Sequence, residues 1–76
     1  MLSMDRIITD PKVLAGKPVI RGTRIPVYLI LNLVAHGKTP EEIREDYPEL
    51  TEADIKAAFQ YAARHMKYEE TRQLEA

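Results

Sequence analysis

The residues best suited to chemistry are four bases in the first third of the chain, with no acid between them. They are Lys12, Lys17, Arg21 and Arg24. Ammonium and guanidinium groups bind phosphate and carboxylate oxygens, and the planar fork of arginine fits either group with two parallel hydrogen bonds. The segment therefore predicts a surface for phosphate or for an acidic protein, and a solvated loop is the alternative.

Enzymatic chemistry has few candidate residues in this chain. Ser3 is the single serine, His36 and His65 are the only histidines, and cysteine is absent. A hydrolytic triad or a thiolate-bound zinc cannot be assembled from this set. His65 and Glu69 have helical i, i+4 spacing, which alone is a weak metal signal, and Gly16-Lys17 lacks the hydroxyl residue that a P-loop requires. We therefore expect a protein that is not an enzyme and takes no metal, cofactor or small-molecule substrate.

One domain is the natural size for a chain of 76 residues, and we expect it to span residues 1–76. A core this small buries only about 60% of the unfolded surface, and without cysteine no disulfide can support it, so self-association is expected. The longest apolar stretch, at 27–35, is shorter than the roughly 18 residues that cross a bilayer, and no secretory signal is visible. We expect a cytoplasmic protein without a membrane span.

Short apolar runs and turn residues predict an extended arm over residues 6–26. A first strand is expected at 6–9, before an Asp-Pro turn. Gly22 lies between two further runs, 19–20 and 25–27, at the first central position of a two-residue type II′ turn, and the proline in the last run confines that strand to a sheet edge. A hairpin this small must lie on helices or pair with the arm of another chain, and the second option predicts an intertwined dimer.

Three helices are predicted to follow and to form the core over residues 27–68. The first has apolar residues at i, i+3, i+4 and i+7 and ends at His36-Gly37. The second begins at Thr39 with a capping box, and the third begins after Thr51 with an apolar stripe. The members of the stripe are Ile55, Ala58, Phe59, Ala62 and Met66. Residues 69–76 are helix-compatible but have few apolar side chains, so this end is expected to fray.

This order of helices is that of a helix-turn-helix domain, whose last helix enters the major groove of DNA. The polar side chains that could contact DNA from the third helix are those of Lys56, Gln60 and Arg64. Glu52 and Asp54 stand at the beginning of that helix, where acids repel phosphate. The net charge is +3 over residues 1–30 and −4 over residues 31–76, so charge opposes DNA binding through the helical half.

The arm carries a motif that is more specific than a hairpin requires. It runs Gly16-Lys17-Pro18-Val19-Ile20-Arg21-Gly22-Thr23-Arg24-Ile25-Pro26-Val27, and matches continue in register at Ile8-Thr9-Asp10-Pro11, Gly37, Pro40-Glu41-Glu42-Ile43, Tyr47-Pro48-Glu49-Leu50-Thr51 and Ile55-Lys56-Ala57-Ala58. Over residues 6–64 the chain resembles the domain of unknown function family 433 (DUF433), which includes VapB-like antitoxins. The resemblance implies a mostly α, homeodomain-like helix-turn-helix fold with a short N-terminal β-hairpin arm, and an antitoxin whose partner is a PIN-like ribonuclease toxin.

The resemblance also divides the candidate residues into two groups. A structural role explains the glycines and prolines of the motif, Gly16, Pro18, Gly22 and Pro26. The candidates for contact with a partner or with DNA are Lys17, Arg21, Thr23, Arg24, Lys56, Gln60 and Arg64. The two arginines could pair within a dimer, bind DNA phosphate or reach carboxylates in the acidic metal site of a PIN-like toxin.

We therefore expect a non-enzymatic, antitoxin-like homodimer that neutralises a PIN-like ribonuclease through its arm and binds double-stranded operator DNA through its helices. Two alternatives stay open on the sequence alone. One is a stand-alone DNA-binding transcriptional regulator, which the same helix order supports. The other is a structural or adaptor dimer without nucleic acid, which explains the acidic helical half directly.

Overall fold

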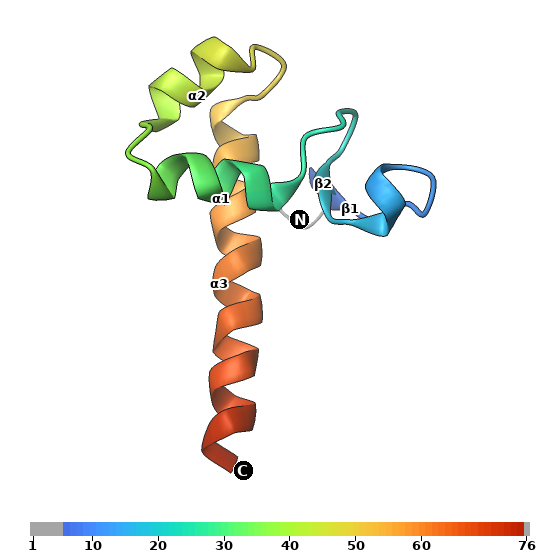
Figure 1. The fold of residues 1–76 in the computed structure, drawn as a ribbon, viewed down its shortest axis with the longest axis vertical. Coiled ribbons are helices and arrows are strands. Elements are labelled where there is room, and N and C mark those ends of the chain that lie inside the picture. Colours follow the sequence, from blue (N-terminus) through green and yellow to red (C-terminus); the bar gives the residue numbers. More distant parts are fainter. Residues whose placement is uncertain (1–5, 76) are drawn as a thin grey trace.

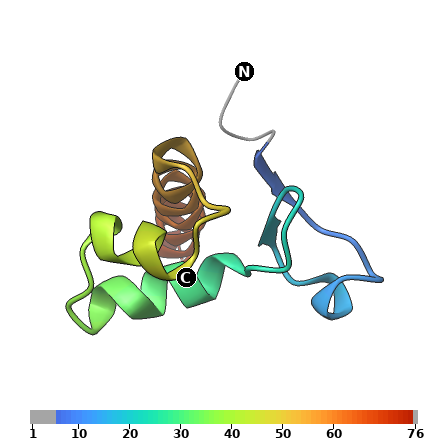
Figure 2. The ribbon, with the colours of Figure 1, turned by 90° about the horizontal axis from the view of Figure 1, so that it is seen from above.

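A short two-stranded arm precedes three helices in the computed structural model, which describes the backbone of residues 6–75 and the side chains of residues 6–67. The elements are β1 (Ile7–Ile8), β2 (Val19–Ile20), α1 (Val27–Ala35), α2 (Pro40–Asp46) and α3 (Glu52–Glu75). α1 crosses α3, and the C-terminal half of α3 extends away from the other elements (Figure 1). Seen from above, the arm and α2 lie on opposite sides of the α3 axis (Figure 2). The expected mostly α fold with a short β arm is confirmed.

The arm is a sheet formed within one chain. β1 and β2 are antiparallel, with Ile7 opposite Ile20 and Ile8 opposite Val19. The predicted first strand is confirmed in shorter form, whereas the predicted strand after Gly22 is reduced to an isolated bridge between Val19 and Pro26. Ile7 packs against the helical core. The arm therefore lies on the helices of its own chain, which is one of the two ways in which a small hairpin is stabilised.

The tight turn of the arm begins one residue earlier than predicted. The N–H of Thr23 donates to the carbonyl oxygen of Ile20 at 3.0 Å, and Gly22 takes the third position of this turn with φ of 81°. The predicted two-residue II′ turn, with Gly22 at its first central position, is therefore wrong. Positive φ at Gly22 is confirmed, and glycine is favoured there because a Cβ atom disfavours the left-handed region.

The link between β1 and β2 contains a strained backbone. A short 3₁₀ turn, η2 (Leu14–Gly16), has positive φ at all three residues: 50° at Leu14, 56° at Ala15 and 84° at Gly16. Glycine adopts this region readily, but the two L residues before it cost about 1–2 kcal/mol each. The structure thus gives Gly16 a conformational role and stores strain beside it.

Local capping interactions set the limits of the helices. α1 ends in a Schellman motif whose left-handed residue is Gly37, with φ of 96°. The Thr39 hydroxyl accepts from the Glu42 N–H at 3.1 Å, and the Glu42 carboxylate accepts from the Thr39 N–H at 2.9 Å, which completes the capping box of α2. Thr51 and Asp54 form the same reciprocal pair at the start of α3, at 3.1 and 3.0 Å. The predicted limits are confirmed, and the second capping box adds to them.

The core lies where the arm and the three helices meet. Fully buried Ile20, Ile30 and Ile43 come from β2, α1 and α2, and α3 contributes Ile55 and Ala58. Both strands and all three helices supply apolar side chains to this cluster. One contiguous core therefore positions the arm relative to α3, as a single domain requires.

The apolar stripe predicted on α3 is only partly buried. Ile55 and Ala58 are in the core, but Phe59 is 37% exposed and Met66 is 65% exposed. Phe59 lies on the open groove between Pro40 and α3, and Met66 lies in the half of α3 that extends away from the other elements (Figure 1). The helix itself continues to Glu75. The predicted fraying of 69–76 falls on residues whose side chains lie outside the described ones.

Candidate functional site

A buried carboxylate ties the arm to α3. The guanidinium of Arg6 donates to the Asp54 carboxylate at 3.0 Å, and the Asp54 side chain is 10% exposed. The other oxygen of Asp54 accepts from the Thr51 N–H, so this residue caps the helix and anchors the arm at once. We expected Asp54 to repel phosphate at the start of α3. The structure pairs this carboxylate with Arg6, whereas Glu52, the other acid predicted to repel phosphate there, is exposed.

Hydrogen bonds of the backbone and of the Thr23 side chain hold the turn between β2 and α1, and none of them involves the Arg24 side chain. The Thr23 hydroxyl donates to the Ile20 carbonyl oxygen at 2.8 Å and accepts from the Ile25 N–H at 3.0 Å. The Arg21 N–H donates to the Arg6 carbonyl oxygen at 2.7 Å, which fastens the turn to β1. Both arginine side chains are exposed on this framework. Thr23 thus has a structural role in addition to the contact role that we predicted for it.

Lys17 marks a second feature of the arm. Its ammonium lies 5.4 Å from the centre of the Tyr28 ring, in cation–π geometry. The two residues line a groove of about 210 Å³ between the arm, α1 and α3, whose other walls include Pro18, Leu31 and Tyr61. We did not predict any tyrosine as a site residue. The sequence feature that could have identified Tyr28 as a site residue is its position directly after the motif that carries the bases.

The three polar residues predicted on α3 form a separate face. Lys56, Gln60 and Arg64 are spaced at i, i+4 and i+8 and are all exposed, on the side of the helix away from the core. They are not brought together with the bases of the arm. The structure therefore divides the predicted site residues between two surfaces, the basic arm and the outward face of α3.

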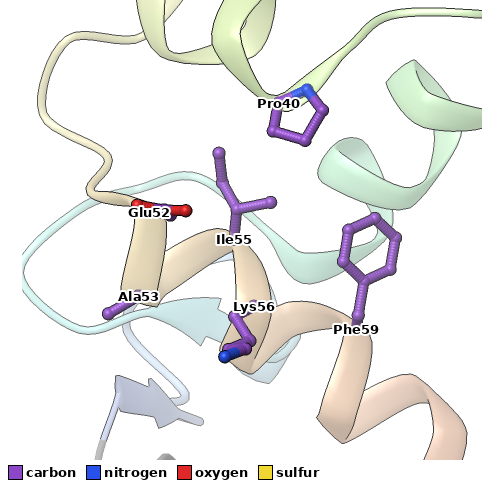
Figure 3. A pocket seen from close by; sticks show the side chains of 6 residues that line it. All are labelled: Pro40, Glu52, Ala53, Ile55, Lys56 and Phe59. Atoms are coloured by element: carbon purple, nitrogen blue, oxygen red, sulfur yellow. The ribbon is translucent and has the colours of Figure 1, made fainter.

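A larger groove opens where α2 approaches α3. It measures about 490 Å³ and is lined by Pro40, Glu52, Ala53, Ile55, Lys56 and Phe59. Figure 3 shows Ile55 pointing toward Pro40, with Phe59 beside it and Lys56 on the side away from Pro40. Its rim carries one acid and one base, so its charge does not select a ligand of either sign.

An exposed ion pair occupies the junction between α1 and α2. The Lys38 ammonium donates to Asp46 at 2.9 Å, and this hydrogen bond, with the charge of Asp46, raises the pKa of Lys38 above its ordinary value. Lys38 therefore stays cationic at neutral pH. Both side chains are in solvent, where such pairs contribute little to stability.

Two features are absent from the described part of the chain: a cluster of metal-binding side chains and a membrane-spanning helix. Among the side chains of residues 6–67, no three of His, Cys, Asp or Glu gather in a way that could hold a metal ion. Among the helices described within residues 6–75, none is long and apolar enough to cross a membrane.

The fold and these surfaces define a small, mostly helical domain with a basic two-stranded arm docked on the start of its last helix. Comparison of the sequence with known families matches residues 7–62 to the family described as "Protein of unknown function (DUF433)", and the chain belongs to this family. The predicted resemblance is confirmed at this level.

Similar proteins support the same assignment. A crystal structure of a DUF433 member protein from Anabaena variabilis has a TM-score of 0.77 and 31% sequence identity, over 88% of this chain and 66% of that chain. The uncharacterized protein y4eO of Sinorhizobium fredii is 41% identical over 56 residues, which are 74% of this chain and 25% of that protein. An uncharacterized protein of Archaeoglobus fulgidus is 67% identical over 24 residues, which are 32% of this chain and 67% of that protein. The chain thus spans a quarter of the rhizobial relative.

Proposed function

We propose that this protein is a non-enzymatic, antitoxin-like protein whose basic arm binds and neutralises a PIN-like ribonuclease. The observation that carries the proposal is the rigid turn of the arm. Backbone hydrogen bonds and the Thr23 hydroxyl hold this turn, and the exposed Arg24 side chain lies outside that framework. The turn fixes the point from which the Arg24 side chain leaves the backbone, and the planar guanidinium suits the carboxylates of an acidic metal site in a nuclease.

The proposal predicts that the reading frame adjoining this gene encodes a PIN-like protein, and that Arg21→Ala combined with Arg24→Ala weakens binding to that protein by about thirtyfold or more. Arginines at the centre of an interface cost about 2 kcal/mol each when truncated. The test is co-expression, pull-down with a measured Kd, and relief of growth arrest. Lys38→Ala is the control, since it removes an exposed base that lies outside the arm and pairs with Asp46. Unchanged neutralisation and unchanged DNA binding in the double variant would refute the proposal.

A second candidate function is DNA binding through a homeodomain-like arrangement of the helices, in a transcriptional regulator. Two observations favour it: Lys56, Gln60 and Arg64 share the outward face of α3, and the charge of Asp54 is paired with Arg6. If α3 contacts the backbone of its own promoter, Lys56→Ala with Arg64→Ala should reduce the salt slope of binding by about 2.

An electrophoretic shift with the promoter fragment at several salt concentrations tests this candidate. Lys38→Ala is the control: it removes one positive charge, and Lys38 pairs with Asp46 away from α3. A shift that is absent at low and at physiological salt would remove the regulator, and the adaptor dimer without nucleic acid would then be the remaining alternative.

Homodimerisation stays part of the proposal. What supports it is the apolar surface that one chain leaves exposed on α3, at Phe59 and Met66. A core of this size gains stability when a partner covers such surface. Since the arm already lies on its own helices, a dimer through α3 does not need exchanged arms.

A further inference from the structure

The groove beside Lys17 has the dimensions of a site for one side chain. Its volume of about 210 Å³ is below the roughly 300–1,000 Å³ of sites that take whole small molecules. Pro18, Leu31 and Ala62 supply its aliphatic walls, and Tyr28 and Tyr61 supply aromatic surface. A groove with this lining favours an apolar side chain that enters from outside.

Tyr28 is a large aromatic side chain that the core of this chain leaves exposed. It stands in the first turn of α1 beside the buried Val27, and 52% of its surface is accessible. Tyrosine offers a large contact area and only two rotatable bonds, so it loses little entropy on binding, and it is enriched among the residues that dominate protein interfaces. The cation–π contact with Lys17 holds its ring in place before any partner arrives.

The charge around the groove selects an acidic occupant. Lys17 lies at its rim and belongs to a segment, 12–24, that carries four bases and no acid. A carboxylate next to the entering side chain would reach the Lys17 ammonium, and a base there would be repelled. Pro18 in the wall of the groove and the turn that carries Arg24 belong to the same arm.

We propose that this groove receives an aromatic or aliphatic side chain of a protein partner, flanked in sequence by aspartate or glutamate whose carboxylate pairs with Lys17. This inference rests on the proposed function, because it names the contact by which the arm recognises its acidic partner. Tyr28 and Lys17 are the residues that determine specificity, and Arg21 and Arg24 add charge at the adjoining turn.

The test uses two synthetic peptides and the isotope-labelled full chain, followed by amide chemical shifts. The first peptide is Gly-Asp-Phe-Glu-Gly with blocked ends, and the second replaces both acids with lysine. The acidic peptide should shift the amides of Lys17, Tyr28 and Tyr61 and bind at least tenfold more tightly than the basic one. Tyr28→Ala should weaken binding of the acidic peptide about tenfold, and Tyr28→Phe, which keeps the ring, should retain it.

Three outcomes would overturn the inference. They are equal binding of both peptides, shifts confined to residues outside the groove, and shifts of the same groove residues by a thymidine decamer but not by the acidic peptide. Circular dichroism of Tyr28→Ala should match the unmodified chain, because the side chain is half exposed. Neutralisation of the ribonuclease that survives Tyr28→Ala while peptide binding is lost would overturn the groove as the interface and leave the proposed function standing.

Discussion

Replacing Ile43 with alanine should destabilise the fold by about 2–5 kcal/mol, which is a large part of the stability of a domain this small. Ile43 is fully buried in the core, and it is the one buried residue of α2. A helix of seven residues is unstable alone in water, so α2 depends on this single side chain for its attachment. The cavity left by alanine would also loosen the packing around Ile30.

Urea and thermal unfolding, followed by far-ultraviolet circular dichroism, measure this effect. Ile43→Val should cost about 0.5–1.5 kcal/mol, since it removes one methylene group from the same place. Glu45→Ala is the matched control on α2, because Glu45 is exposed and such substitutions stay within about 0.5 kcal/mol. An Ile43→Ala midpoint equal to that of the control would contradict the packing described for α2.

Replacing Asp54 with alanine should cost about 2 kcal/mol. The loss has two parts: the capping interaction with Thr51, at about 1 kcal/mol, and the contact with Arg6, at about 1 kcal/mol. The second part is modest because 46% of the Arg6 side chain is accessible to solvent, which screens the charges. Denaturant unfolding of the single variants and of the double variant with Arg6→Ala separates the two parts.

Asp54→Asn supplies the control for this prediction, because asparagine keeps one acceptor oxygen for the helix cap but has no charge for Arg6. We expect it to lose about half as much stability as Asp54→Ala. If Arg6→Ala has no effect and the double variant equals Asp54→Ala alone, the ion pair does not attach the arm, and only the capping role stands.

The helix limits were predictable because capping depends on residues that are close in sequence. Thr39 and Glu42 are three positions apart, and Gly37 follows the last apolar turn directly. Strand pairing was less predictable, since β1 and β2 are separated by the whole η2 segment. Gly22 allows positive φ at either central position of a turn, so its presence alone could not decide where the turn begins.

The candidate site was predictable in its composition and not in its arrangement. The bases of the arm are visible in the sequence, but Arg6 and Asp54 are 48 positions apart, and charge counts cannot show that they meet. The sequence feature that could have indicated a structural role for Asp54 was its spacing from Thr51, which fits a capping box. Periodicity identified the apolar side of α3 correctly, yet it could not indicate how far α1 and α2 cover that side, which left Phe59 exposed.

The left-handed backbone at Leu14 and Ala15 affects how readily the arm detaches from the helices. When the arm detaches, both residues can return to ordinary conformations, which releases about 2–4 kcal/mol and lowers the free energy of this local opening. We therefore expect the amide hydrogens of β1 to exchange with solvent through detachment of the arm, faster than those of α1 exchange through global unfolding. A partner that binds only the docked arm shifts this equilibrium by mass action and slows that exchange.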